Sequence, residues 1–206
     1  MSSLRSHTPE PEARIRQLLP ELVRKCIHIL IALVPWFAAL DRSYTALLLM
    51  GGILVYSWAE GLRFMGFSTP FISGITRAVL RKQEQDHFAL GPVTLGLGAL
   101  LALILFPPPV AAVAVYALAF GDSAATLVGR FLGHLRPAFM AGKSLEGSLS
   151  CFAASALAAY LVLSDWRIAA GAGLASMLAE ALPFGDFDNL AIPLASGITI
   201  LILLPL

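Results

Sequence analysis

The stretch PPPVAAVAVYALAFGDSAATLVGR, Pro107 to Arg130, decides the fold of this chain. Three consecutive prolines end any preceding helix, because proline lacks the backbone N–H that a helix interior requires. The apolar run that follows is long enough for a membrane-spanning helix, which needs about 20 mostly apolar residues. Asp122 lies near the end of this run, and an acidic side chain near the middle of a bilayer costs roughly 2.5–3.5 kcal/mol. The stretch therefore predicts a membrane span that carries a functional aspartate.

The composition supports a membrane protein. The chain has 206 residues, of which 58% are apolar and 13% are charged, and its mean hydropathy is +0.80. Soluble domains carry about 25% charged residues. The formal net charge of +1 gives no bulk basic character, which argues against nucleic-acid binding.

Seven apolar runs are candidates for membrane-spanning helices. They cover approximately residues 20–39, 43–60, 92–106, 109–128, 147–163, 168–182 and 190–206. We expect an all-α polytopic bundle of about seven transmembrane helices. Residues 1–19 would form a polar N-terminal tail that is not a cleaved signal peptide, and residues 20–206 would form a single transmembrane catalytic domain.

The segment 63–91 differs from these seven runs because its apolar residues fall on one helical face. This pattern indicates an amphipathic helix lying on the membrane surface. The apolar face consists of Phe71, Ile72, Ile75 and Val79, and the flanking cations are Arg77, Arg81 and Lys82.

The distribution of Lys and Arg predicts the orientation. With a cytoplasmic N-terminus and seven spans, twelve of the 14 basic residues fall on the cytoplasmic side and only Arg42 and Arg167 fall outside. The twelve are Arg5, Arg14, Arg16, Arg24, Lys25, Arg63, Arg77, Arg81, Lys82, Arg130, Arg136 and Lys143. We expect a multi-pass protein of the bacterial inner membrane, with its active site on the cytoplasmic face.

The same threading gathers most carboxylates near one membrane surface, with only Asp41 and Asp165 opposite. The gathered groups are Glu60, Asp122, Glu146, Glu180, Asp186 and Asp188, and His28 joins them. The ionisable side chains would form a layer at that surface and not a string through the bilayer.

Small residues follow one side of the helix that carries Asp122. Gly121, Ala125 and Gly129 recur every four residues, which is typical of close packing between membrane helices. Close packing does not account for Asp122, although Asp122 and Arg130 lie on adjacent turns of one side and could pair with each other.

The stretch GKSLEGS, Gly142 to Ser148, opens the next apolar run. Free N–H groups and the helix dipole at a helix start favour phosphate, and Lys143 adds a positive charge. The alternative is that Lys143 marks the membrane edge and Ser144 caps the helix. The stretch is not a P-loop, because the upstream glycine spacing is missing.

Arg24, Lys25 and His28 enter the first apolar run. Arg24 and His28 share a helical face, since they are four residues apart. The plain interpretation is a basic anchor at the membrane interface. The functional interpretation is that His28, one turn deeper, binds phosphate or shuttles a proton.

The stretch GDFDNL, Gly185 to Leu190, precedes the last apolar run. It is either an acidic loop with a helix cap at Asp188 or Asn189, or a Mg²⁺ site of hard oxygen ligands. Glu60 with Arg63, and Glu180, are weaker candidates that one-turn ion pairs explain.

Taken in order, these motifs resemble the polyprenol kinase family, which includes dolichol kinase, phytol kinase and CTP-dependent diacylglycerol kinase. The block from Asp122 to Ser148 is also similar to part of phosphatidate cytidylyltransferase, whose longer C-terminal signature is absent here. The residues that carry the resemblance are Arg24, Lys25, His28, Glu60, Arg63, Gly91, Pro92, Thr94, Gly121, Asp122, Ala125, Gly129, Arg130, Gly133, Lys143, Ser144, Glu146, Gly147, Ser148, Asp188, Asn189, Leu190 and Pro193.

The resemblance implies a membrane-embedded enzyme that transfers phosphate to a lipid alcohol, with CTP as donor and Mg²⁺ as cofactor. The expected catalytic residues are Asp122, Lys143, His28 and Asp188. The expected nucleotide-binding residues are Arg24, Lys25, Gly129, Arg130, Lys143, Ser144, Gly147 and Ser148, with N–H groups near Ser144 to Ser148 holding the triphosphate. The expected metal ligands are Asp122, Asp188 and Glu146.

Three alternatives remain open. A cytidylyltransferase would make a CDP-lipid from a phosphorylated lipid. A small transporter would place its polar site near the midplane and often contains an inverted repeat, which is not found here. A structural membrane protein would not gather Asp122, Lys143 and Asp188 on one side. Glycine-rich helix faces would also permit a homodimer.

Overall fold

The computed structural model describes residues 11–67 and 87–204, with side chains described from Glu21 onward. The expected amphipathic helix falls mostly on residues 68–86, which lie outside the described residues, as do Phe71, Ile72, Ile75, Val79, Arg77, Arg81 and Lys82. The first helix begins at Pro11, within the segment expected to be a polar tail.

The described residues form helices and no strand, which confirms the all-α expectation. The helices are α1 (Pro11–Leu30), α2 (Val34–Leu40), α3 (Arg42–Phe64), α5 (Gly91–Leu105), α6 (Pro108–Tyr116), α7 (Asp122–Phe131), α8 (Leu145–Leu163), α9 (Trp166–Ala181) and α10 (Asp188–Leu203). A 3₁₀ turn (Ile31–Leu33) joins α1 to α2, and a wider π turn (Ala117–Gly121) joins α6 to α7. Further 3₁₀ turns cover Ala138–Met140 and Gly185–Phe187.

Each expected apolar run lies on one helix or on helices joined without a break. Five of these are long and apolar enough to cross a membrane: Glu21–Leu40, Arg42–Phe64, Pro108–Phe131, Leu145–Leu163 and Gly185–Leu203. Helices α5 and α9 are shorter, at 15 and 16 residues. The chain is therefore a membrane protein, and the count of seven spans stays a prediction.

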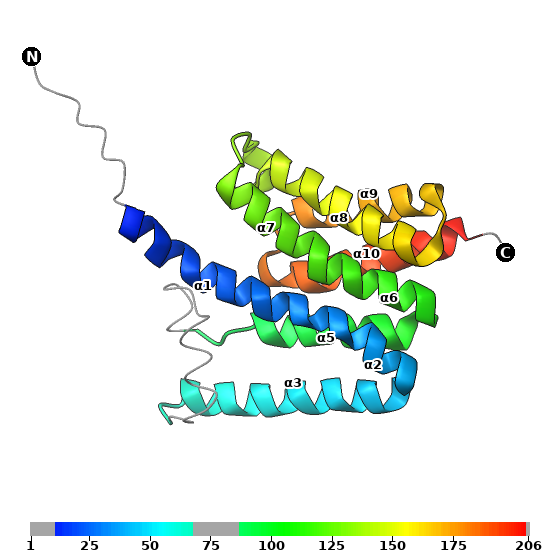
Figure 1. Ribbon diagram of the computed structural model, residues 1–206. Helices are drawn as coiled ribbons and strands as arrows, with labels where there is room; N and C mark the ends of the chain where they lie inside the picture. The colour runs from blue at the N-terminus through cyan, green and yellow to red at the C-terminus, as the bar shows by residue number, and fades with distance from the viewer. Residues whose placement is uncertain (1–10, 68–86, 205–206) are drawn as a thin grey trace, which may run out of the picture.

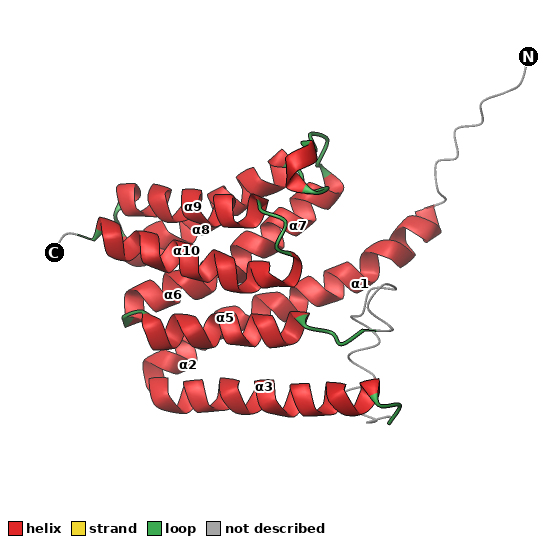
Figure 2. Cartoon of the chain, turned by 180° about the vertical axis from the view of Figure 1, so that it is seen from behind, coloured by secondary structure: helices red, strands yellow, loops and turns green. Residues whose placement is uncertain are grey.

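The helices run back and forth side by side, so their connections gather at two ends (Figures 1 and 2). The α2–α3, α5–α6 and α8–α9 connections lie at one end with the end of α10. The end of α3, the start of α5, and the α7–α8 and α9–α10 connections lie at the other, which we call the polar end. Which side of the membrane the polar end faces is a prediction.

The segment from α6 to α7 is the centre of the bundle. In the apolar 18-residue stretch of Pro108–Phe131, 61% of the residues are buried. The corresponding share is 17% for each of the segments Glu21–Leu40 and Arg42–Phe64. Val113, Ala114 and Val115 have no exposed surface. The first two candidate spans are therefore peripheral, and few of their side chains are buried.

Small residues bring α7 and α8 close together. A Cβ atom on Gly147 of α8 would lie 2.7 Å from the carbonyl oxygen of Ala125 and 3.1 Å from the Cα of Gly129. The expectation of close helix packing along Gly121, Ala125 and Gly129 is confirmed. Since this face is used within the chain, these glycines do not form a free surface for a second copy.

A buried carboxylate fixes the start of α5 against the end of α3. Glu60 accepts hydrogen bonds from Arg63, three residues later, at 2.6 and 2.8 Å, as the one-turn pair predicts. It also accepts the backbone N–H of Ala89 at 2.8 Å. This contact positions the residues that begin α5 at the polar end.

Candidate active site

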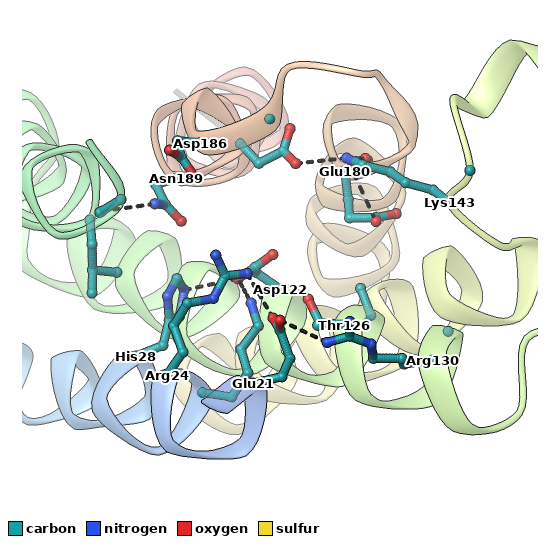
Figure 3. A pocket seen from close by; sticks show the side chains of 18 of the residues that line it. Glu21, Arg24, His28, Asp122, Thr126, Arg130, Lys143, Glu180, Asp186 and Asn189 are labelled. Carbon is teal, nitrogen blue, oxygen red and sulfur yellow. Dashed lines mark hydrogen bonds and ion pairs between the residues drawn. The ribbon is translucent and has the colours of Figure 1, made fainter. Parts of the chain in front are cut away.

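A cavity of about 560 Å³ opens at the polar end of the bundle (Figure 3). Most of the expected site residues line it: Arg24, Lys25, His28, Asp122, Gly129, Arg130, Lys143, Ser144 and Asp188. Glu21, Thr126, Glu180, Asp186 and Asn189 also contribute polar groups. These groups come from four helices, α1, α7, α9 and α10, and from the α7–α8 and α9–α10 connections, and they meet in one place, as the layer of ionisable residues predicts.

The first cluster in the cavity joins α1 to the start of α7. Lys25 donates to Asp122 Oδ2, and His28 Nε2 lies 3.1 Å from the same oxygen. The three side chains are almost entirely buried. Lys25 and His28 lie one turn apart on α1, so both reach the carboxylate from one helical face.

The contacts of His28 define its tautomer. Nε2 lies 3.2 Å from the carbonyl oxygen of Leu118, in addition to its contact with Asp122. Both neighbours are acceptors, so Nε2 carries the proton and Nδ1 is the acceptor nitrogen of the neutral ring. Leu118 belongs to the π turn before Asp122, and such turns are frequent at functional sites.

The second cluster lies across the cavity, where Figure 3 shows Lys143 and Glu180 opposite Glu21, Arg24 and His28. Lys143 Nζ lies 2.7 Å from Asp188 Oδ2, and it donates to the carbonyl oxygens of Leu182, at 2.8 Å, and Glu180. Carbonyl groups at a helix C-terminus lack intrahelical partners and favour a cation. Lys143 therefore ties the α7–α8 connection to the end of α9 and the start of α10.

The third cluster centres on Glu21, which the sequence analysis missed. Its two carboxylate oxygens accept from Arg24 and from Arg130, each at 2.8 Å. Glu21 is 5% exposed. The signal was present in the sequence, because Glu21 lies three and four residues before Arg24 and Lys25 and shares their face.

Two expected pairings are wrong. Asp122 and Arg130 do not pair, since Asp122 contacts Lys25 and His28 whereas Arg130 contacts Glu21. Glu180 is not held by a one-turn ion pair: its carboxylate accepts from Ser148 Oγ at 2.5 Å and lies 3.8 Å from Lys143 Nζ.

The stretch from Gly142 to Ser148 has its backbone N–H groups partly satisfied within the protein. Ser144 caps α8 by accepting from the N–H of Gly147 at 3.1 Å, as the capping interpretation predicts. The N–H groups of Leu145 and Ser148 donate to the carbonyls of Leu135 and Ser144. Lys143 and Ser144 line the cavity, whereas Gly147 and Ser148 are not among its lining residues.

The three expected metal ligands are not in one place. Glu146 lies outside the cavity lining, and its carboxylate accepts the N–H groups of His134 and Leu135 at 2.9 and 3.0 Å. No group of three His, Cys, Asp or Glu side chains that could hold a metal is found among residues 21–67 and 87–204. Mg²⁺ usually takes one or two carboxylates together with phosphate oxygens, so Asp122 and Asp188 fit it without a third acid.

Asp188 has an oxygen available for such a role. Its Oδ2 contacts Lys143, whereas its Oδ1 is buried and has no hydrogen-bond partner in the described part of the chain. A buried, unpartnered carboxylate oxygen costs free energy that a bound cation would recover. Next to it, Asn189 donates to Thr94 Oγ1 at 2.9 Å and to the carbonyl of Gly91 at 3.3 Å, which anchors this turn to α5.

Known proteins similar to this chain are lipid kinases. A CTP-dependent diacylglycerol kinase 1 from Eremothecium gossypii is 37% identical over 91 residues, which are 44% of this chain and 28% of that protein. A phytol kinase from Synechocystis sp. is 27% identical over 190 residues, covering 86% of this chain and 77% of that protein. A probable chloroplastic phytol kinase from Triticum aestivum is 24% identical, covering 88% and 67%.

These comparisons confirm the resemblance that the motifs indicate, because the chain is similar both to CTP-dependent diacylglycerol kinases and to phytol kinases. The diacylglycerol kinase from Eremothecium gossypii is matched over less than a third of its own length. No protein-family model and no solved structure matches the chain.

Proposed function

We propose that this protein is a membrane-embedded lipid kinase that transfers the terminal phosphate of CTP to the hydroxyl of a lipid alcohol, with Mg²⁺. The observation that carries the proposal is one cavity lined by five Lys or Arg side chains and five carboxylates. The cations are Arg24, Lys25, Arg130, Arg136 and Lys143, and the carboxylates are Glu21, Asp122, Glu180, Asp186 and Asp188. Phosphoryl transfer asks a protein chiefly to position reactants and to neutralise phosphate charge, which this set of groups can do. The names of the relatives support the same reaction.

Arginine and lysine side chains would hold the triphosphate. Arg24 Nε is a buried donor without a partner among the residues that the structure describes, and the Arg130 side chain is 44% exposed at the cavity, so both have N–H groups left for phosphate. Lys143 approaches from the opposite side and would contact a different phosphate. Guanidinium groups suit phosphate oxygens because their N–H donors form a fixed fork.

Asp188 Oδ1 and the second oxygen of Asp122 would hold Mg²⁺ together with phosphate oxygens. When bound, this cation would neutralise charge on the phosphates and orient them for transfer. We leave Glu146 out of the set, because its carboxylate is occupied by the α7–α8 connection.

The acceptor hydroxyl would lie beside His28 and Asp122. His28 Nδ1 is the acceptor nitrogen of the ring, so it would take the hydroxyl proton as the alcohol oxygen bonds to the terminal phosphorus. The bond from that phosphorus to the bridging oxygen breaks at the same time, and CDP leaves with the electron pair. Asp122 holds the Nε2–H of the ring and orients it, in the manner of carboxylate–histidine pairs.

The products distinguish this reaction from its closest alternative. A kinase releases CDP and a lipid phosphate, whereas a cytidylyltransferase releases pyrophosphate and a CDP-lipid. The purified protein would be incubated with CTP or ATP, Mg²⁺ and a mixture of polyprenol, phytol and diacylglycerol, and the lipids analysed by mass spectrometry. We expect a lipid phosphate and CDP with CTP, and neither product in excess EDTA. A CDP-lipid, or no product from any alcohol, would contradict the proposal.

Glu21 provides a test of how the arginines are positioned. In Glu21→Gln, one arginine would face an amide NH₂ in place of a carboxylate oxygen. We expect the KM for CTP to rise about tenfold, equivalent to about 1.4 kcal/mol, while kcat changes less than about twofold. Initial rates over a range of CTP concentrations measure both quantities. An unchanged KM would show that Glu21 does not position the arginines.

We also infer seven membrane spans, a cytoplasmic N-terminus and an active site at the cytoplasmic face. The support is the polar end itself, which collects Arg24, Arg63, Arg130, Arg136 and Lys143, in line with the excess of basic residues on cytoplasmic surfaces. Among the basic residues with described side chains, Arg42 and Arg167 alone lie at the opposite end.

A further inference from the structure

Part of the cavity lining is mostly apolar. It consists of Ile27 of α1, Tyr56 of α3, and Pro92 and Leu95 of α5, which line the cavity together with the charged residues and which we call the apolar wall. Ile27 directly precedes His28, and its side chain is 40% exposed. An exposed apolar wall continuous with a charged cavity has to meet either water or hydrocarbon.

The two helices that flank this wall diverge. From the α2–α3 turn, α1 tilts away from α3 toward the polar end, as both views show (Figures 1 and 2). Helix α1 packs on α7 and the π turn, whereas α3 packs on α2 and α5. Within the described residues, α1 and α3 therefore do not pack extensively on each other.

Both segments carry exposed apolar side chains that are suited to lipid. Leu30 at the end of α1 and Leu33 in the following 3₁₀ turn are 60% and 51% exposed, and Leu54 and Val55 of α3 are 64% and 58% exposed. Both helices belong to the peripheral candidate spans, so these side chains would meet the hydrocarbon of the bilayer. A lipid between the two helices could reach Ile27 while its hydrocarbon chain stays out of water. Exposure of apolar groups to water is unfavourable in free energy, and every methylene adds to the cost.

We propose that the hydrocarbon chain of the lipid alcohol enters the cavity sideways from the bilayer, between α1 and α3. It would lie against Ile27, Tyr56 and Leu95, with its hydroxyl beside His28. This inference rests on the proposed kinase function and adds the route and the binding surface of the acceptor. CTP would reach the arginines and Lys143 from the aqueous end of the same cavity, so the two substrates would not share an entrance.

The test fills the apolar wall and leaves the charged residues in place. In Ile27→Trp, the larger side chain would occupy the space of the chain, and we expect the KM for a long-chain alcohol to rise about tenfold or more. The KM for CTP should stay within about twofold, because no phosphate contact changes. The matched control is Leu157→Trp, which places the same residue at an exposed position of α8, outside the cavity lining and outside the proposed route, and should leave both constants unchanged.

A second measurement does not depend on the folding of a variant. The wild-type protein in lipid nanodiscs would be illuminated with a lipid alcohol that carries a diazirine on its chain, and the labelled peptides identified by mass spectrometry. We expect labels on α1, α3 and α5 near Ile27, Tyr56 and Leu95, and competition by the unlabelled alcohol.

The outcomes separate this inference from the proposed function. Suppose that the wild-type enzyme phosphorylates the alcohol, but Ile27→Trp keeps the wild-type KM for the alcohol or the label maps to other helices. The sideways route is then wrong, and the proposed kinase function is unaffected. If the wild-type enzyme phosphorylates no lipid alcohol with CTP, the proposed function and the route fall together.

Discussion

Asp122→Asn is expected to abolish phosphoryl transfer, with kcat reduced by about a thousandfold or more. Asparagine keeps the shape of the side chain but loses the charge that Lys25 and His28 contact in the cavity. The Nε2–H of His28 would lose its ionic acceptor, and the proposed cation site would lose one of its two carboxylates. Release of CDP in the presence of the preferred alcohol measures the effect.

Lost activity must be separated from lost folding, because removing one member of a buried ion pair costs about 3–5 kcal/mol. The double variant Lys25→Met, Asp122→Asn removes both charges, and it should recover thermal stability in detergent but not activity. Ser123→Ala is the matched control on the same helix. Its buried hydroxyl has no partner in the described residues and does not line the cavity, so both stability and activity should be kept. Activity above about a tenth of wild type in a stable Asp122→Asn protein would contradict the assignment.

The second large effect is expected for Lys143→Met, which should lower kcat/KM for CTP by a factor of about a hundred to a thousand. The variant keeps much of the aliphatic stem but loses the ammonium group that contacts Asp188 and the carbonyls at the end of α9. A phosphate on that side of the cavity would then lack its cation. Steady-state kinetics with CTP, at a saturating concentration of the alcohol, measure the loss.

Lys143 also links three parts of the fold, so a control is needed for a purely structural role. Arg167→Met removes a cation at the opposite end of the bundle and should leave kcat/KM unchanged. A structural role alone would lower thermal stability and raise the KM values for both substrates together. A selective loss with CTP, at wild-type KM for the alcohol, is the result that the proposed contact predicts.

The sequence predicted the helices well because apolar runs and breaks between them are local signals. The prolines from Pro107 to Pro109 do separate α5, which ends at Leu105, from α6, which begins at Pro108. The small-residue face of α7 could also be predicted, because residues four apart in the sequence lie on the same side of a helix. The clustering of ionisable groups at one end followed from the alternation of helix direction, with no knowledge of how the helices pack.

The partners of the charged side chains could not be predicted, since they depend on how each helix is rotated and tilted against its neighbours. Asp122 and Arg130 share one side of α7 in sequence, yet α1 supplies a closer partner for each of them. Glu146 lies in the same motif as Lys143, but it is turned to the backbone of His134 and Leu135. Glu21 was missed because a carboxylate in the first turn of an expected span is typical of a residue at the membrane interface.

The contacts of Glu21 have a consequence for the order in which ligands arrive. Four cations in the cavity lie against carboxylate counter-ions: Glu21 serves Arg24 and Arg130, Asp122 serves Lys25, and Asp188 and Glu180 serve Lys143. If a nucleotide without a metal ion bound to these cations, its phosphates would displace the carboxylates, which would then lie close together with their negative charges unpaired. A nucleotide that arrives with a divalent cation supplies phosphates for the Lys and Arg side chains and a positive charge for the carboxylates. For the proposed kinase, binding of the preformed nucleotide–metal complex is therefore the route that keeps the charges of the cavity balanced.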